Sequence, residues 1–147
     1  MRPTYALLLA LGLGLGLAAC ATGSGPGSPG HPYNVEGAYE GSFVFDGSPF
    51  EATVRLRTRS GGRVTGAFRV GAPVEIDGPV QGAVRDELLR LTVRYTNPGG
   101  CDGRIEGILT IERGGGEITG PVTVTDCGTP VAGRVRLVRR PLGPGGA

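Results

Sequence analysis

The chain of 147 residues has no lysine and no tryptophan, and it has only one histidine and one methionine. Without lysine there is no Schiff-base chemistry, and a single histidine leaves most acid–base mechanisms without a candidate. That histidine, His31, lies in a stretch rich in Gly, Pro and Ser with no second ligand nearby, so we predict no metal centre there. The formal net charge is only +2, which argues against the concentrated basic face of a nucleic-acid-binding protein.

Charged residues are also absent from residues 6–19, a run of Ala, Leu and Gly that follows a single positive charge at Arg2. As a helix this run would be about 21 Å long, whereas the hydrocarbon layer of a bilayer is roughly 30 Å thick. We therefore predict a cleaved signal peptide over residues 1–19 rather than a membrane-spanning helix.

The run ends in Leu17-Ala18-Ala19-Cys20, an aliphatic residue and two small residues before a cysteine. This motif resembles that of bacterial lipoprotein precursors. The resemblance implies cleavage before Cys20, a diacylglycerol thioether on its sulfur and a fatty acyl group such as palmitate on its amino group. It implies a lipid-anchored protein of the bacterial cell envelope. Since Ala21 rather than Asp follows, it favours the outer membrane, facing the periplasm or the cell surface.

Residues 20–36 combine the predicted lipidated cysteine with a linker rich in Gly, Pro and Ser, and residues 141–147 form a similar tail that we expect to be disordered. Residues 21–34 are fourteen residues, and a flexible chain of that length has a root-mean-square end-to-end distance of about 20 Å. We therefore expect the intervening domain, residues 37–140, to stand clear of the lipid surface.

Two cysteines remain once Cys20 is assigned to the lipid, namely Cys101 and Cys127. In an exported domain such a pair predicts a disulfide, although two free thiols or a soft-metal site are alternatives. Two cysteines supply too few ligands for a closed zinc site. Asp102 and Asp126 flank the pair, but two carboxylates alone make a weak calcium site. We therefore predict no metal and no cofactor.

Between residues 37 and 140 apolar and polar side chains alternate with a period of two, which is typical of strands with one buried face. A finer motif of an apolar residue, Gly and two further apolar residues recurs on the buried face. It covers residues 39–45, 64–70, 105–111, 118–124 and 131–137, with a shorter copy at 80–84. Residues 50–56 keep it with Ala52 in place of Gly, and residues 89–95 make an eighth alternating stretch that lacks the small residue. Because short Gly-rich turns make sequence neighbours antiparallel, we predict an all-β fold, an eight-stranded antiparallel up-and-down β-barrel. A two-sheet β-sandwich is the alternative.

The inward glycines have two interpretations: they permit sharp strand curvature, or they leave room for a ligand. Pairing Ile111 with Ile118 across the turn at 114–116 puts every apolar side chain of this hairpin on one face. The same register brings Cys101 within one step of Cys127 at the far end of the hairpin. Pro121 points outward and cannot donate a ladder hydrogen bond, so we expect weakened pairing there.

Six of the aromatic residues fall on the inward face, and no charged residue does, so we expect no catalytic residue and no enzyme. The interior is either a plain core or a pocket for a small apolar ligand. These aromatic residues are Tyr39, Phe43, Phe45, Phe50, Phe68 and Tyr95.

Gly37-Ala38-Tyr39 resembles the Gly-x-Trp motif on the first strand of the calycins, the lipocalin- and avidin-like small barrels. Arg134, Arg136 or Arg139 would then correspond to the arginine of their last strand. The resemblance implies a small closed barrel, and Tyr39 stands where the family has Trp.

We therefore expect a non-catalytic envelope lipoprotein whose barrel recognises a protein or an envelope component, for example as an enzyme inhibitor. The alternative is a lipocalin-like carrier of a small apolar ligand. Outward arginines could meet anionic headgroups, but acidic residues are interspersed among them in the sequence. This mixture favours an ordinary solvated exterior.

Overall fold

The computed structural model describes residues 25–28 and 30–141. The predicted signal peptide, Cys20 and all but the first residue of the predicted tail lie outside the described residues. Within the described part, no helix is long and apolar enough to cross a membrane.

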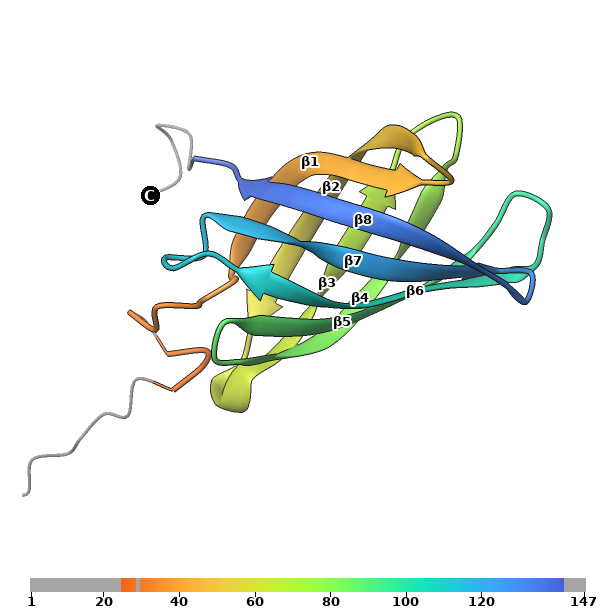
Figure 1. Cartoon of the computed structure of the whole chain (residues 1–147). Coiled ribbons are helices and arrows are strands. Elements are labelled where there is room, and N and C mark those ends of the chain that lie inside the picture. The colour runs from red at the N-terminus through yellow and green to blue at the C-terminus, as the bar shows by residue number, and fades with distance from the viewer. Residues whose placement is uncertain (1–24, 29, 142–147) are drawn as a thin grey trace, which may run out of the picture.

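Eight antiparallel strands form a closed barrel in which each strand pairs with its sequence neighbour and β8 pairs with β1 (Figure 1). The predicted barrel is therefore confirmed, and the sandwich alternative is wrong. The strands are β1 (Gly37–Phe45), β2 (Ser48–Thr58), β3 (Arg63–Val70), β4 (Ile76–Arg85), β5 (Leu88–Thr96), β6 (Asp102–Ile111), β7 (Glu117–Asp126) and β8 (Thr129–Arg139). A single 3-10 turn, η1 (Ser60–Gly62), joins β2 to β3.

The register of the β6–β7 hairpin is the one that its apolar pattern predicts. Ile111 pairs with Ile118 and Ile105 with Val124. Pairing is missing between residues 108–109 and 120–121, on either side of which the same register holds. Pro121 is exposed and has no N–H to donate, so it interrupts the ladder as expected.

Two hairpins turn through two residues in the left-handed region, as the right-handed twist of the strands requires. Asp46 and Gly47 have φ of 48° and 73°, and Cys127 and Gly128 have φ of 48° and 84°. Asp-Gly is the typical sequence for such a turn. Cys127 is unusual there, because a side chain other than that of Gly, Asn or Asp rarely adopts a positive φ.

The inward glycines lie where a neighbouring strand approaches too closely for any side chain. An ideal Cβ would lie 2.0 Å from the carbonyl oxygen of Arg136 at Gly41 and 2.0 Å from that of Arg55 at Gly66. At Gly78, which the motif search did not single out, it would lie 2.1 Å from the carbonyl oxygen of Arg94. The space beside these glycines is filled by backbone, so their role is strand curvature rather than room for a ligand.

Residues 26–28 and 30–36 lie against the end of the barrel at which β1 begins and β8 ends, which we call the capped end (Figure 1). The N–H of Gly62 donates to the carbonyl of Pro26 at 3.0 Å, and the N–H of Gly114 donates to that of Pro32 at 2.6 Å. Val35 is fully buried in the core. The segment thus runs from the β2–β3 junction to the β6–β7 turn and closes this end.

The predicted linker is therefore not free along its whole length. From Pro26 onward, its described part is seated on the barrel by backbone hydrogen bonds rather than free. Cys20 precedes Pro26 by only six positions. With a lipid on Cys20, the barrel would therefore lie closer to the lipid surface than a linker of fourteen free residues would allow.

Candidate functional site

The barrel interior is filled by side chains. Tyr39, Phe43, Phe68 and Tyr95 are buried, while Phe45 and Phe50 are partly buried and pack against the same core. The ring of Phe43 stacks on Phe45 with centroids 6.2 Å apart and meets Phe68 edge to face at 5.8 Å. The predicted inward aromatics therefore pack on one another and on the aliphatic core.

At the capped end, Arg139 joins the first strand, the last strand and the N-terminal segment. Its Nε and Nη2 donate to the Tyr39 hydroxyl at 3.1 and 2.9 Å. Its guanidinium also donates to the carbonyl of Gly114 at 3.2 Å and to the carbonyl of Asn34. The Tyr39 hydroxyl in turn donates to Gly115 at 2.9 Å. Of the three arginines named as candidates for the last-strand arginine of the calycins, Arg139 is the one that contacts Tyr39.

The pKa of Tyr39 is raised mainly by burial, and the nearby Arg139 guanidinium partly offsets this rise. The phenol therefore stays protonated at neutral pH and remains a donor. With every polar atom of this pair engaged by backbone or by its partner, the arrangement is a structural clasp rather than a reactive site.

The opposite end, which we call the disulfide end, carries the two cysteines. Cys101 precedes β6 and Cys127 follows β7, and their sulfurs lie at disulfide distance with Cα atoms 5.4 Å apart. Asn97 organises this end: its Oδ1 accepts the N–H of Cys101 at 3.1 Å, and its Nδ2 donates to Asp126 at 3.2 Å. The pair thus lies at the hairpin end that the register predicts.

The remaining polar groups at this end leave little for a metal. Cys101, Asp126 and Cys127 place ligand atoms within 4.8 Å of one another. With both sulfurs in a disulfide, only the Asp126 carboxylate is left as a ligand, and Asn97 already occupies it. Burial and the neighbouring Asp126 raise the pKa of Tyr95 to about 12. Its phenol therefore stays protonated and faces the carboxylate across 3.5 Å.

We expect mature protein to be about two mass units lighter before reduction than after it, because the disulfide lacks two thiol hydrogens. Cys127→Ser should lower the free energy of unfolding by about 3 kcal/mol, the value for a loop of this length. Mass analysis and urea denaturation measure these two effects. Cys101→Ser should cost the same, and the double variant no more than either. Two alkylatable thiols at these positions in protein that has not been reduced would contradict the pairing.

The outer wall has a groove that the sequence analysis missed. It has a volume of about 410 Å³ and is lined by Ala83, Arg85, Leu88, Arg90 and Ile108. Leu88 and Ile108 are 42% and 51% exposed, and they lie on the neighbouring strands β5 and β6 in the same groove. Both stand at outward positions of the two-residue alternation. The expectation that every apolar side chain of the β6–β7 hairpin shares one face is therefore wrong for Ile108.

Charged residues on the wall are segregated by strand. Strands β2 to β5 carry seven arginines and two carboxylates, whereas β6 to β8 and β1 carry four arginines and five carboxylates. The acidic residues that are interspersed with arginines in the sequence are therefore unevenly distributed around the barrel.

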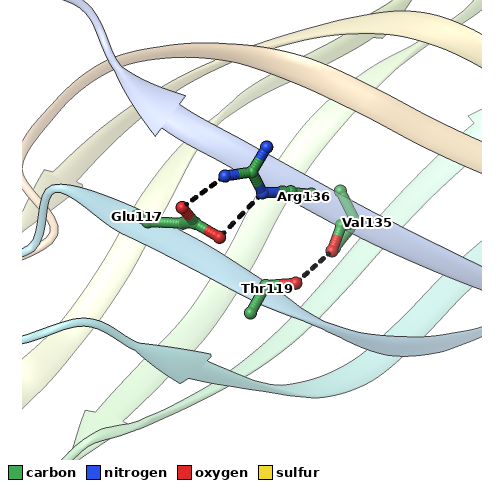
Figure 2. A network of polar contacts seen from close by, with 4 residues as sticks. All are labelled: Glu117, Thr119, Val135 and Arg136. Atoms are coloured by element: carbon green, nitrogen blue, oxygen red, sulfur yellow. Dashed lines mark hydrogen bonds and ion pairs between the residues drawn. The ribbon is translucent and has the colours of Figure 1, made fainter.

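Ion pairing follows the same division. Figure 2 shows the acidic half of the wall, where Arg136 on β8 forms a two-pronged ion pair with Glu117 on β7, each N–O distance being 2.9 Å. This pair raises the pKa of Arg136. Beside it, the Thr119 hydroxyl donates to the carbonyl of Val135 at 3.1 Å (Figure 2). Among the described residues, the only ion pair within β2 to β5 joins Arg69 to Asp77.

The described residues offer a filled barrel, a clasped end, a disulfide end and a charged outer wall. The single histidine, His31, accepts the N–H of Tyr33 at 3.3 Å in the N-terminal segment and faces none of the other candidate groups described above. Comparison of the chain with known protein families, with curated proteins and with solved structures gives no match.

Proposed function

We propose that this chain is a non-catalytic lipoprotein of the bacterial cell envelope whose barrel recognises an envelope component or a protein through its outer surface. The observation that carries this proposal is the packed interior. The ring of Phe43 packs on those of Phe45 and Phe68, the other inward aromatics lie in or against the same core, and backbone of adjacent strands fills the space beside the inward glycines. A carrier would instead need an apolar cavity of several hundred cubic ångströms.

The lipid anchor rests on the motif Leu17-Ala18-Ala19-Cys20. A diacylglycerol and a further acyl chain on Cys20 exceed what stable membrane anchoring requires. Outer-membrane location, facing the periplasm or the cell surface, follows from Ala21 on the same resemblance.

The contact of Tyr39 with Arg139 supports the calycin resemblance, because the two residues stand on the first and last strands. A small-molecule carrier of the lipocalin type remains the second candidate on that ground alone. Since a barrel of this kind serves many functions, the filled interior outweighs the resemblance. Inhibition of an enzyme is one concrete form of surface recognition.

Native and denaturing mass spectrometry of the detergent-extracted protein tests both parts. Under denaturing conditions we expect the mass of residues 20–147 plus the lipid on Cys20. Under native conditions we expect no additional small molecule, since the core is already packed. An apolar compound released on denaturation would favour the carrier.

Cys20→Ser provides the matched control for the anchor. The variant should lose the lipid mass and be released or accumulate as precursor. Finding it cleaved and still firmly bound to membranes would contradict the lipoprotein proposal.

A further inference from the structure

The arginines nearest the capped end on the basic half of the wall form one continuous surface. The cross-strand register places Arg63 opposite Ala83, Ala83 opposite Arg90, and Arg90 opposite Ile108. This row crosses β3 to β6 and is about 14 Å long, at roughly 4.8 Å per strand. All four residues point outward, so two guanidinium groups and an exposed aliphatic side chain share one line.

Three further residues complete this surface at its edge toward the capped end. Arg85 pairs with Leu88 across the tight β4–β5 connection, and Arg59 lies next to the start of β3. Arg59, Arg63, Arg85 and Arg90 are all exposed, and the described residues give none of them an ion pair. We call this surface the basic patch: Arg59, Arg63, Arg85, Leu88, Arg90 and Ile108.

Acidic residues reduce the charge of the patch without cancelling it. Asp86 and Glu87 form the β4–β5 turn beside it. Four arginines against these two carboxylates leave a net positive charge. Leu88 and Ile108 line the groove of about 410 Å³ together with Arg85 and Arg90.

The N-terminal segment leaves the barrel beside this patch. A Cβ at Gly27 would lie 2.1 Å from the carbonyl oxygen of Arg59, and one at Gly62 would lie 2.9 Å from Cβ of Pro26. The chain is therefore packed tightly against the β2–β3 junction up to Pro26. From there to Cys20 the six residues span at most about 20 Å, even fully extended.

We propose that the basic patch is a docking surface for an anionic lipid bilayer, with its guanidinium groups on headgroup phosphates and Leu88 and Ile108 in the interface. The orientation rests on the proposed function, because a lipid on Cys20 brings this corner of the barrel to the membrane. A guanidinium group donates two parallel hydrogen bonds to two oxygens of one phosphate, and it is more weakly hydrated than an ammonium group. Basic residues beside a lipid anchor add the electrostatic contribution that strengthens membrane attachment.

Vesicle binding of an unacylated chain tests the surface apart from the anchor. The chain would comprise residues 20–147 with Cys20→Ser, which keeps every residue of the core. We expect it to bind vesicles of phosphatidylglycerol and phosphatidylcholine, and to bind much more weakly to phosphatidylcholine alone. High salt should release it, because the charges are exposed.

Paired variants locate the binding surface. Arg63→Gln with Arg90→Gln should weaken vesicle binding about 25-fold, at about fivefold per arginine near an anionic surface. Arg104→Gln with Arg134→Gln removes the same charge from the acidic half and should leave binding nearly unchanged. Leu88→Gln should weaken binding, whereas Val138→Gln, at an equally exposed position on β8, should not.

Equal losses in the two arginine pairs, or equal binding to both vesicle types, would overturn the proposal. Binding to soluble polyglutamate but not to vesicles would instead assign the patch to an acidic protein partner, which also overturns it. These outcomes are independent of acylation. An unmodified Cys20 in the extracted protein would contradict the anchor while leaving the vesicle result as it stands.

Discussion

Gly66→Val is expected to lower the free energy of unfolding by about 3 kcal/mol, at the upper end of ordinary overpacking. The new Cβ would lie 2.0 Å from the carbonyl oxygen of Arg55 and 3.1 Å from Cδ2 of Leu56. The carbonyl belongs to the adjacent strand, so relief requires β2 and β3 to separate. For a domain of about 100 residues the melting temperature should fall by about 15 °C, which thermal denaturation measures.

Thr65→Val is the matched control, since Thr65 is exposed on the same strand and Val is the better strand former. It should be nearly neutral. Gly107→Val should cost less than Gly66→Val, because its Cβ would be 2.7 Å from the carbonyl oxygen of Pro121, where the ladder is already interrupted. A neutral Gly66→Val would mean that the strands are less sharply bent than the structure has them.

Arg139→Gln is expected to lower the free energy of unfolding by about 2–4 kcal/mol, because it removes several hydrogen bonds from a charged donor at a partly buried site. Arg139 donates these hydrogen bonds to the hydroxyl of Tyr39 and to the carbonyls of Asn34 and Gly114. Residues 30–36 should become more accessible to protease and to hydrogen exchange. Urea denaturation and limited proteolysis measure the two effects.

Arg136→Gln, three residues earlier on the same strand, separates this clasp from the loss of a charge. Its ion pair with Glu117 is exposed to solvent, so its loss should change the free energy of unfolding little. The N-terminal segment should keep its protection in this variant. If the two substitutions cost the same, the Arg139 contacts do not fasten the segment.

Much of the barrel was predictable because one physical constraint, a single buried face, acts on every strand. The period-two alternation predicts strand positions, and the pairing of Ile111 with Ile118 predicts the β6–β7 register that the structure has. Pro121 predicts the gap in the β6–β7 ladder, because proline has no N–H to donate. The choice between curvature and ligand space was left open, since it depends on the position of a neighbouring carbonyl.

The docking of the N-terminal segment was not predictable from composition. Its Gly-, Pro- and Ser-rich sequence is typical of a linker, and the groups that hold it are backbone carbonyls of Pro26 and Pro32. Any residue supplies such a carbonyl. The uneven distribution of charge likewise becomes visible only when the charged residues are assigned to strands and the strands are ordered around the barrel. The sequence alone shows only that acidic residues and arginines alternate along the chain.

The closure of β1 against β8 also bears on the order of folding. Seven of the eight strand pairings join sequence neighbours, and the eighth joins residues as far apart as Tyr39 and Arg139, separated by 100 positions. Local hairpins of this kind form early, whereas the long closure carries the largest loop entropy. Since Arg139 lies at the end of β8 and also donates a hydrogen bond to Asn34, the same strand closes the barrel and holds the N-terminal segment. Removal of β8 would therefore leave β1 and β7 as open strand edges and the N-terminal segment without its Arg139 contact at once.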